Sequence, residues 1–176
     1  MTTSDGIDTP HESRLSKALR ELLHTQRVAS LATLDAEGQA FVSMVPFAIE
    51  PTEGVLVIHI SGLAAHTGHL AQQPLCTALV MKPELDGHPV HALPRVTLAL
   101  EAHSLTVDDD TYSSCRAAYL ARFPDAQHMT ALPDFRFVAL RVRSARQVAG
   151  FGAARSVEAA ELAQALRNPA TPGVLH

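Results

Sequence analysis

The sequence predicts an α+β fold dominated by antiparallel strands: a small barrel of six strands with short helices at its ends. Two observations carry this prediction. The apolar runs in the middle of the chain are short and joined by tight turns that contain glycine or proline, which favours antiparallel pairing. Helical patterns occur without the regular alternation of strand and helix that builds parallel sheets. Because no internal repeat or domain boundary is evident, the 176 residues predict one domain over residues 9–168.

The hydrophobic periodicity places the elements in chain order. Thr9-Pro10-His11-Glu12 has the pattern of a capping box, which predicts that the first helix begins there. Pro46 cannot donate to a strand ladder, so it indicates a bulge or an edge inside the second strand. The expected elements are a helix at 10–25, strands at 28–34, 41–49 and 55–60, a short helix, strands at 76–81 and 95–105, a helix near 109–122, a strand at 135–148, and a helix at 156–167 capped by Ser156.

Composition excludes several classes of protein. Apolar residues make up 47% of the chain and charged residues 18%, as in a globular domain with its own core. The net charge of −4 offers no basic field to a nucleic acid. No apolar run approaches the ~20 residues of a membrane-spanning helix, and the polar start is unlike a signal peptide. We expect a cytoplasmic protein that binds neither nucleic acid nor membrane, with a disordered start at 1–8 and a loose tail at 169–176.

Two motifs suggest cofactor or metal binding but lack the residues that such binding needs. Gly150-Phe151-Gly152-Ala153-Ala154-Arg155 is close to a dinucleotide fingerprint, yet Arg155 replaces a small residue and no βαβ unit surrounds it. We expect a flexible corner there. The pairs His66-x-x-His69 and His88-x-x-His91 lack further zinc ligands, so no metal site is predicted. Haem ligation stays open, because a single histidine suffices at any spacing.

The segment SGLAAHTGHL, residues 61–70, gathers hydroxyl and imidazole groups at the start of the short helix. The first amides of a helix are unpaired and carry partial positive charge, which suits phosphate or carboxylate. Ser61 and Thr67 add hydroxyl donors, and His66 adds a donor or a charge. The residues alone leave two interpretations about equally open: an anion site, or a helix start that Ser61 merely caps.

Several segments, in their order and spacing, resemble the FMN-binding split-barrel family related to pyridoxamine-phosphate oxidase, and within it a branch of haem-iron utilisation proteins. The similarity covers residues 14–155. Its pieces are RVASLATLD (27–35), FVSMVPFAI (41–49), the strand with SGLAAHTGHL (55–70), LPRVTLALEA (93–102), and AYLARFPDA, DFRFVALRV and GFGAAR within 118–155.

The resemblance implies a six-stranded split barrel that dimerises through its sheet, with two FMN sites at the subunit interface. It assigns Ser61, His66 and Thr67 to the FMN phosphate, and Arg95 to the ring or the phosphate. Ser43 would lie under the isoalloxazine ring. These donors suit a dianionic phosphate.

The expected function is therefore that of a homodimeric FMN-binding flavoprotein, a flavin-dependent oxidoreductase in which the cofactor supplies the chemistry. No catalytic acid or base stands out. Two alternatives stay open: a flavin-independent haem-binding or haem-degrading protein of iron utilisation, and an interaction module without a cofactor. Gly62 and His69 stand where the branch commonly carries arginine and asparagine.

Overall fold

A computed structural model describes residues 12–169 and confirms the predicted antiparallel α+β class. The strands form one curled sheet in the order β2-β1-β5-β6-β7-β4-β3, with β8 paired to β7. The elements are α1 (Arg14–Thr25), β1 (Val28–Leu34), β2 (Ala40–Pro46), β3 (Ala48–Glu50), β4 (Val55–Ser61), α2 (Ala65–Gln72), β5 (Leu75–Met81), β6 (Arg95–Ser104), α3 (Tyr112–Arg122), β7 (Phe135–Val148), β8 (Ala154–Val157) and α4 (Ala159–Arg167), with 3-10 helices at Val90–Ala92 and Pro124–Ala131.

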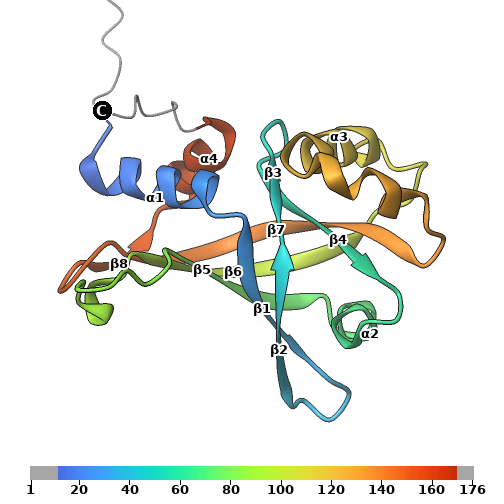
Figure 1. Cartoon of the computed structure of the whole chain (residues 1–176), viewed down its shortest axis with the longest axis horizontal. Coiled ribbons are helices and arrows are strands. Elements are labelled where there is room, and N and C mark those ends of the chain that lie inside the picture. Colours follow the sequence, from blue (N-terminus) through green and yellow to red (C-terminus); the bar gives the residue numbers. More distant parts are fainter. Residues whose placement is uncertain (1–11, 170–176) are drawn as a thin grey trace, which may run out of the picture.

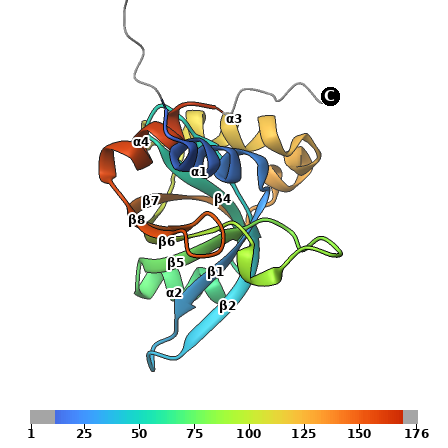
Figure 2. The ribbon, with the colours of Figure 1, turned by 90° about the vertical axis from the view of Figure 1, so that its left-hand side faces the viewer.

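The helices are divided between two sides of the long strands. In the view of Figure 1, α1 and α4 lie above the long strands on the left and α3 lies above them on the right, whereas α2 and the β1–β2 hairpin lie below; Figure 2 shows the same division. This division separates the helix predicted to hold an anion from the rest of the helical layer.

The sheet has eight strands rather than the predicted six, for two reasons. The predicted strand at 41–49 divides at Phe47, where the chain passes from pairing with β1 to pairing with β4. The Phe47 side chain is buried, and its N–H donates to the Arg27 carbonyl at 3.0 Å. Pro46, just before it, has no N–H to continue the ladder. The second addition is β8, which pairs with β7 where a flexible corner and a helix start were predicted.

Three helices begin later than predicted, among them α3, which begins at Tyr112 rather than near residue 109. The N-cap of α1 is Ser13, whose hydroxyl accepts a hydrogen bond from the Ser16 N–H at 3.1 Å. Glu12, the expected last member of the capping box, instead pairs with Arg20 at 2.7 Å. The rest of that box, the predicted start at 1–8 and the tail from 170 onward lie outside the described residues. Ser156 lies in β8, and α4 follows Glu158 without a side-chain cap.

The core has two parts that share β4. The larger part lies inside the half barrel and receives leucines from α1 and α4, whereas the smaller part lies under α3. Every residue from Val55 to Ile60 is buried, because β4 packs against the barrel interior on one face and against α3 on the other. Cys76 and Cys115 are buried free thiols. Within residues 12–169, no helix is long and apolar enough to cross a bilayer.

Candidate cofactor site

Two hydroxyl–imidazole pairs join α2 to the β1–β2 hairpin. Ser43 Oγ lies 2.9 Å from His66 Nδ1, and Thr33 Oγ1 lies 3.0 Å from His69 Nδ1. The structure therefore brings together two of the predicted site residues, Ser43 and His66. The second nitrogen of His66 is buried without a partner, and burial lowers the pKa of this imidazole, with the nearby His69 acting in the same direction. A neutral His66 is consequently favoured.

Ser61 lies just before α2 and Thr67 in its first turn, but both hydroxyl groups already donate hydrogen bonds within the chain. Ser61 Oγ donates to Asp134 Oδ2 at 2.9 Å and accepts from the Leu63 N–H. The Thr67 hydroxyl donates to the Ser61 carbonyl at 2.6 Å. Ser61 is not the cap of α2, whose N-cap is Ala64. The Asp134 carboxylate adds negative charge beside the donors predicted for phosphate, which opposes a dianion.

Gly62 is closely packed at this strand end. A Cβ at this position would lie 3.1 Å from the Asp134 carbonyl oxygen and 3.2 Å from an Arg136 guanidinium nitrogen. The backbone is held by a hydrogen bond from the Gly62 N–H to that same carbonyl. The chain thus places the Arg136 guanidinium where a larger residue 62 would put its side chain. Sequence reasoning missed Arg136, which is marked only by its place in an alternating strand.

Arg95 lies away from the α2 group within one chain. In the β5–β6 pair, Leu75 is opposite Glu101 and Met81 is opposite Arg95. Since α2 leads into the Leu75 end, Arg95 is six positions away along the sheet, about 20 Å at the usual rise of a strand. Its guanidinium donates to the Leu93 carbonyl at 3.0 Å. One protomer therefore does not unite Arg95 with Ser61, His66 and Thr67.

The exposed face of β1, β2 and β5 is apolar, a feature the sequence interpretation did not identify. In the strand register Met44 is opposite Ser30, and Val42 is opposite Ala32, which in turn is opposite Thr77. Met44 is 64% and Val42 is 62% exposed. Because paired residues share one face, these strands present a continuous apolar patch. Its large exposed members are Val28, Leu34, Val42, Met44, Leu75 and Met81.

A cavity of about 560 Å³ lies on this face. Small side chains, among them Ala32, Ala40 and Ala99, line this cavity, and Arg143 is its one arginine. The register of β6 and β7 shifts between Ala99 and Leu100, which leaves Arg143 without an opposite residue as a β-bulge. Bulges redirect side chains and are common beside binding sites. An apolar floor with one guanidinium suits a flat apolar group that carries an acid.

The described residues form no site for a bare metal ion. Across 12–169, no three His, Cys, Asp or Glu side chains are grouped to hold one. Arg155, whose motif suggested a dinucleotide, instead donates hydrogen bonds to Glu161 and Gln147. The turn at Gly150–Gly152 joins two antiparallel strands, so it has no phosphate-binding helix behind it.

These features define a class: an antiparallel split barrel with a cofactor-sized cavity on an exposed apolar sheet face. A family model described as Pyridoxamine 5'-phosphate oxidase matches residues 15–149, and the chain belongs to this family. The resemblance seen in the sequence is thereby confirmed.

Relatives of this chain include proteins named for haem. It is 28% identical over 152 residues to "Heme oxygenase HutZ" of Vibrio cholerae, covering 86% of this chain and 85% of that protein. It is 30% identical over 146 residues to "Non-canonical heme oxygenase HOZ, chloroplastic" of Arabidopsis thaliana, covering 81% of this chain but only 43% of that protein. A heme-binding protein structure from Mycobacterium smegmatis superimposes with a TM-score of 0.76 at 29% identity, covering 86% of this chain and 60% of the other.

Proposed function

We propose that this protein binds haem as a homodimer, on the exposed apolar face of β1, β2 and β5. The observation that carries the proposal is the cavity of about 560 Å³ on that face, which has an apolar floor and the Arg143 guanidinium. A haem needs an apolar surface for its ring and cations for its acidic groups. The names of the relatives support this ligand over a flavin. Bound haem would supply an iron centre for oxygen chemistry.

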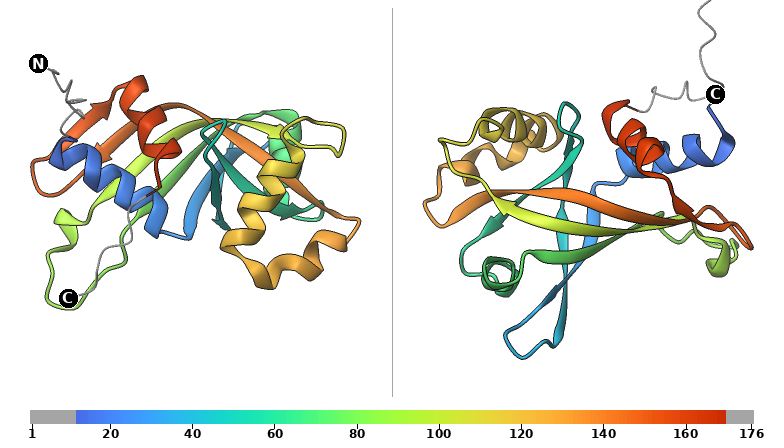
Figure 3. Two further views of the ribbon diagram at one scale, coloured as in Figure 1. Left: turned by 90° about the horizontal axis from the view of Figure 1, so that it is seen from above. Right: turned by 180° about the vertical axis from the view of Figure 1, so that it is seen from behind.

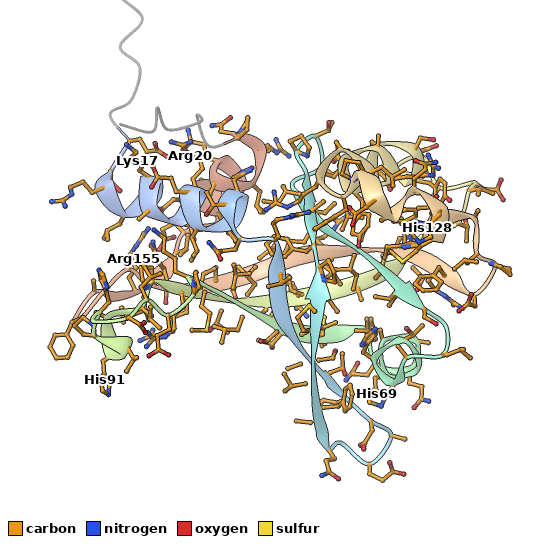
Figure 4. The ribbon with its side chains drawn as sticks, viewed as in Figure 1. Lys17, Arg20, His69, His91, His128 and Arg155 are labelled. Atoms are coloured by element: carbon orange, nitrogen blue, oxygen red, sulfur yellow. The ribbon has the colours of Figure 1, made fainter. Side chains whose placement is uncertain are left out.

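His69 is the residue we propose as the iron ligand. A histidine that binds a metal is oriented by a hydrogen bond to its other ring nitrogen. Thr33 holds His69 Nδ1 at 3.0 Å. The remaining nitrogen of His69 is not among the buried atoms without a partner, in contrast to that of His66. Figure 4 shows the side chain of His69, a residue of α2, beside the β1–β2 hairpin. It therefore combines a fixed ring with an accessible nitrogen.

The two parts of this site lie on opposite faces of β1. The side chain of Thr33, to which His69 is bonded, is buried, whereas its neighbours Ala32 and Leu34 point to the exposed face. We propose that the ring surface comes from one protomer and His69 from its partner. A patch of six large exposed apolar side chains also favours a partner subunit, since monomers seldom leave such a surface uncovered.

The test is a titration of the purified full chain with hemin, followed by its visible absorption. We expect a saturable Soret shift, and a changed spectrum with weaker binding in His69→Ala. The matched control is His103→Ala, because His103 is exposed and, among residues 12–169, pairs only with Asp109. Absence of any saturable change in the unaltered protein would overturn haem binding. A wild-type spectrum and affinity in His69→Ala would overturn the assignment of the ligand.

FMN-dependent oxidoreductase activity is the second candidate, because the whole matched region belongs to the pyridoxamine-phosphate oxidase family. Ser61 and Thr67 would have to release Asp134 and a backbone carbonyl to bind the phosphate. Titration with FMN, followed by quenching of flavin fluorescence, separates the two candidates. Saturable quenching that Ser61→Ala weakens would favour FMN, and unquenched flavin beside a hemin-induced Soret shift would favour haem.

A further inference from the structure

A second cavity, of about 470 Å³, lies between the middle of β7, helix α4 and the turn before β4. Figures 1 and 3 show α4 lying over β7. The wall from α4 and β8 is apolar and includes Leu162, Ala163, Leu166 and Val157. Three arginines, Arg141, Arg143 and Arg167, are among the residues that line it. We call this space the arginine cavity. Its volume is in the usual range for small-molecule sites, roughly 300–1,000 Å³.

The guanidinium groups of the arginine cavity are available to a ligand. Within residues 12–169, Arg141, Arg143 and Arg167 make no ion pair and no side-chain hydrogen bond. By contrast, Arg20 and Arg155 are held by Glu12 and Glu161. The only carboxylate in the lining is that of Glu53, so positive charge predominates. A cluster of like charges is unfavourable without an anion beside it. The cavity is thus complementary to a negatively charged ligand.

The charge is concentrated at one end. Arg141 is opposite Val55 in the β4–β7 pair, next to Gly54 in the turn. The Nε of Arg167 lies 3.6 Å from where a Cβ on Gly54 would stand, and Gly54 has a φ of 69°, which favours glycine. Arg141 and Arg167 therefore both lie beside this turn, one on a strand and the other at a helix end, with Glu53 next to them in the lining.

The opposite end of the cavity is apolar. Val157 is paired with Ala145, four positions along β7 from Arg141 and so about 13 Å away. Between the two ends, Leu162 and Leu166 of α4 face the strand as buried side chains. The lining thus has two arginines at the turn end and apolar residues toward Val157, a polarity that matches an amphiphile.

We propose that the arginine cavity binds an amphiphilic carboxylate, an organic acid with one anionic head and an apolar chain. The carboxylate would pair with Arg141 and Arg167, whose planar guanidinium groups match a carboxylate with two parallel hydrogen bonds. The chain would lie along α4 toward Val157. This site is separate from the proposed haem face, except that Arg143, in the bulge, lines both cavities. The proposal does not depend on haem binding.

Isothermal titration of the full chain with sodium laurate, kept below its micelle concentration, tests the proposal. We expect saturable binding of one laurate per chain. Arg141→Gln and Arg167→Gln should each weaken it at least tenfold, because each removes a charged hydrogen-bond partner. Ala163→Trp should abolish binding, since its indole would fill the channel.

Two matched controls separate this cavity from general effects. Arg146→Gln removes the same charge from β7, and Ala160→Trp adds the same indole to α4, but neither residue lines the cavity. Both controls should bind laurate within twofold of the unaltered protein. Circular dichroism melting verifies that each variant is folded, and the glutamine variants test the site even if Ala163→Trp does not fold. Absence of saturable binding in the unaltered protein, or unchanged affinity in Arg141→Gln and Arg167→Gln, would overturn the proposal. Binding that Met44→Glu removes instead would assign laurate to the exposed sheet face and overturn it equally.

Discussion

The two faces of the β1–β2 hairpin have opposite characters. One face carries Val42 and Met44, which are among the most exposed large apolar side chains of the molecule. The other face carries Ser43 and Thr33, whose hydroxyls are paired with imidazoles of α2. Adjacent residues of one strand thus serve different purposes, because successive side chains point to opposite faces. The polar face holds α2 within the chain, whereas the apolar face is exposed and is the face proposed to bind haem and a partner subunit.

Met44→Glu should have the largest effect, on the apolar face. We expect the proposed dimer to dissociate, because an unpaired carboxylate buried in an apolar interface costs several kcal/mol. Haem binding should be lost with it. Size-exclusion chromatography with light scattering gives the mass, and hemin titration gives the ligand. The matched control is Val107→Glu, which adds the same charge at an exposed valine outside the patch. A Met44→Glu protein that stays dimeric would show that this face is not the interface.

Leu31→Ala tests the side of β1 that the hairpin buries. Leu31 is fully buried in the main core, so its truncation should lower the free energy of unfolding by about 2–5 kcal/mol. Val42→Ala, on the exposed face, should change it by less than about 0.5 kcal/mol. Both are measured by urea denaturation in the Met44→Glu background, so that dimer contacts do not contribute. Equal losses would contradict the assignment of the two faces.

The sequence could predict the strands but not the use of their faces. Clean alternation, as in Arg95–Ser104, identifies a strand with one buried face. In FVSMV, residues 41–45, both alternate sets contain apolar residues, so periodicity does not tell which set enters the core. That choice is made by the register with β1, a tertiary property. The apolar patch was missed for this reason.

The candidate site was only partly predictable for a related reason. Resemblance to a family identified the segment around α2, and the structure brings Ser43 and His66 together there. The Ser61 hydroxyl donates its hydrogen bond to Asp134, which is 73 positions away, so no local sequence pattern reveals that this donor already has a partner. The same holds for β8, whose pairing with β7 overrides the turn signal of its glycines.

Thr33→Val should have a smaller effect, on the polar face. The substitution keeps the shape of the side chain but leaves His69 Nδ1 without its hydroxyl partner. We expect about 1 kcal/mol less stability and, if His69 binds haem iron as proposed, roughly 10–100-fold weaker hemin binding. Thr130→Val is the control, because its hydroxyl bonds to Arg116 under α3, far from the hairpin. Unchanged hemin affinity in Thr33→Val would mean that the Thr33–His69 pair only attaches α2.

The smallest predicted effect is the pH dependence of stability. It compares His24 and His66, which have hydrogen-bond partners, with His59, whose Nδ1 has none. Burial lowers the pKa of His24, His59 and His66 below the ordinary value. His59 is the extreme case: it is 7% exposed, its Nδ1 has no partner, and its ring centroid lies 4.4 Å from that of Phe137. The charge of Arg116 lowers its pKa further. These histidines favour the neutral form in the folded protein.

The sign of the pH dependence follows from proton binding. Below about pH 6.5 the unfolded chain takes up protons on these histidines and the folded chain does not. Stability is therefore complete above that pH and falls as the pH drops toward the lowered pKa values, by at most about 1.4 kcal/mol per pH unit for each histidine. Urea denaturation at a series of pH values should show this slope, and His59→Phe should reduce it. His103→Phe, at an exposed site, should leave it unchanged. If His59→Phe keeps the wild-type slope, protonation of His59 does not contribute to acid destabilisation, and His24 and His66, which have hydrogen-bond partners, account for it.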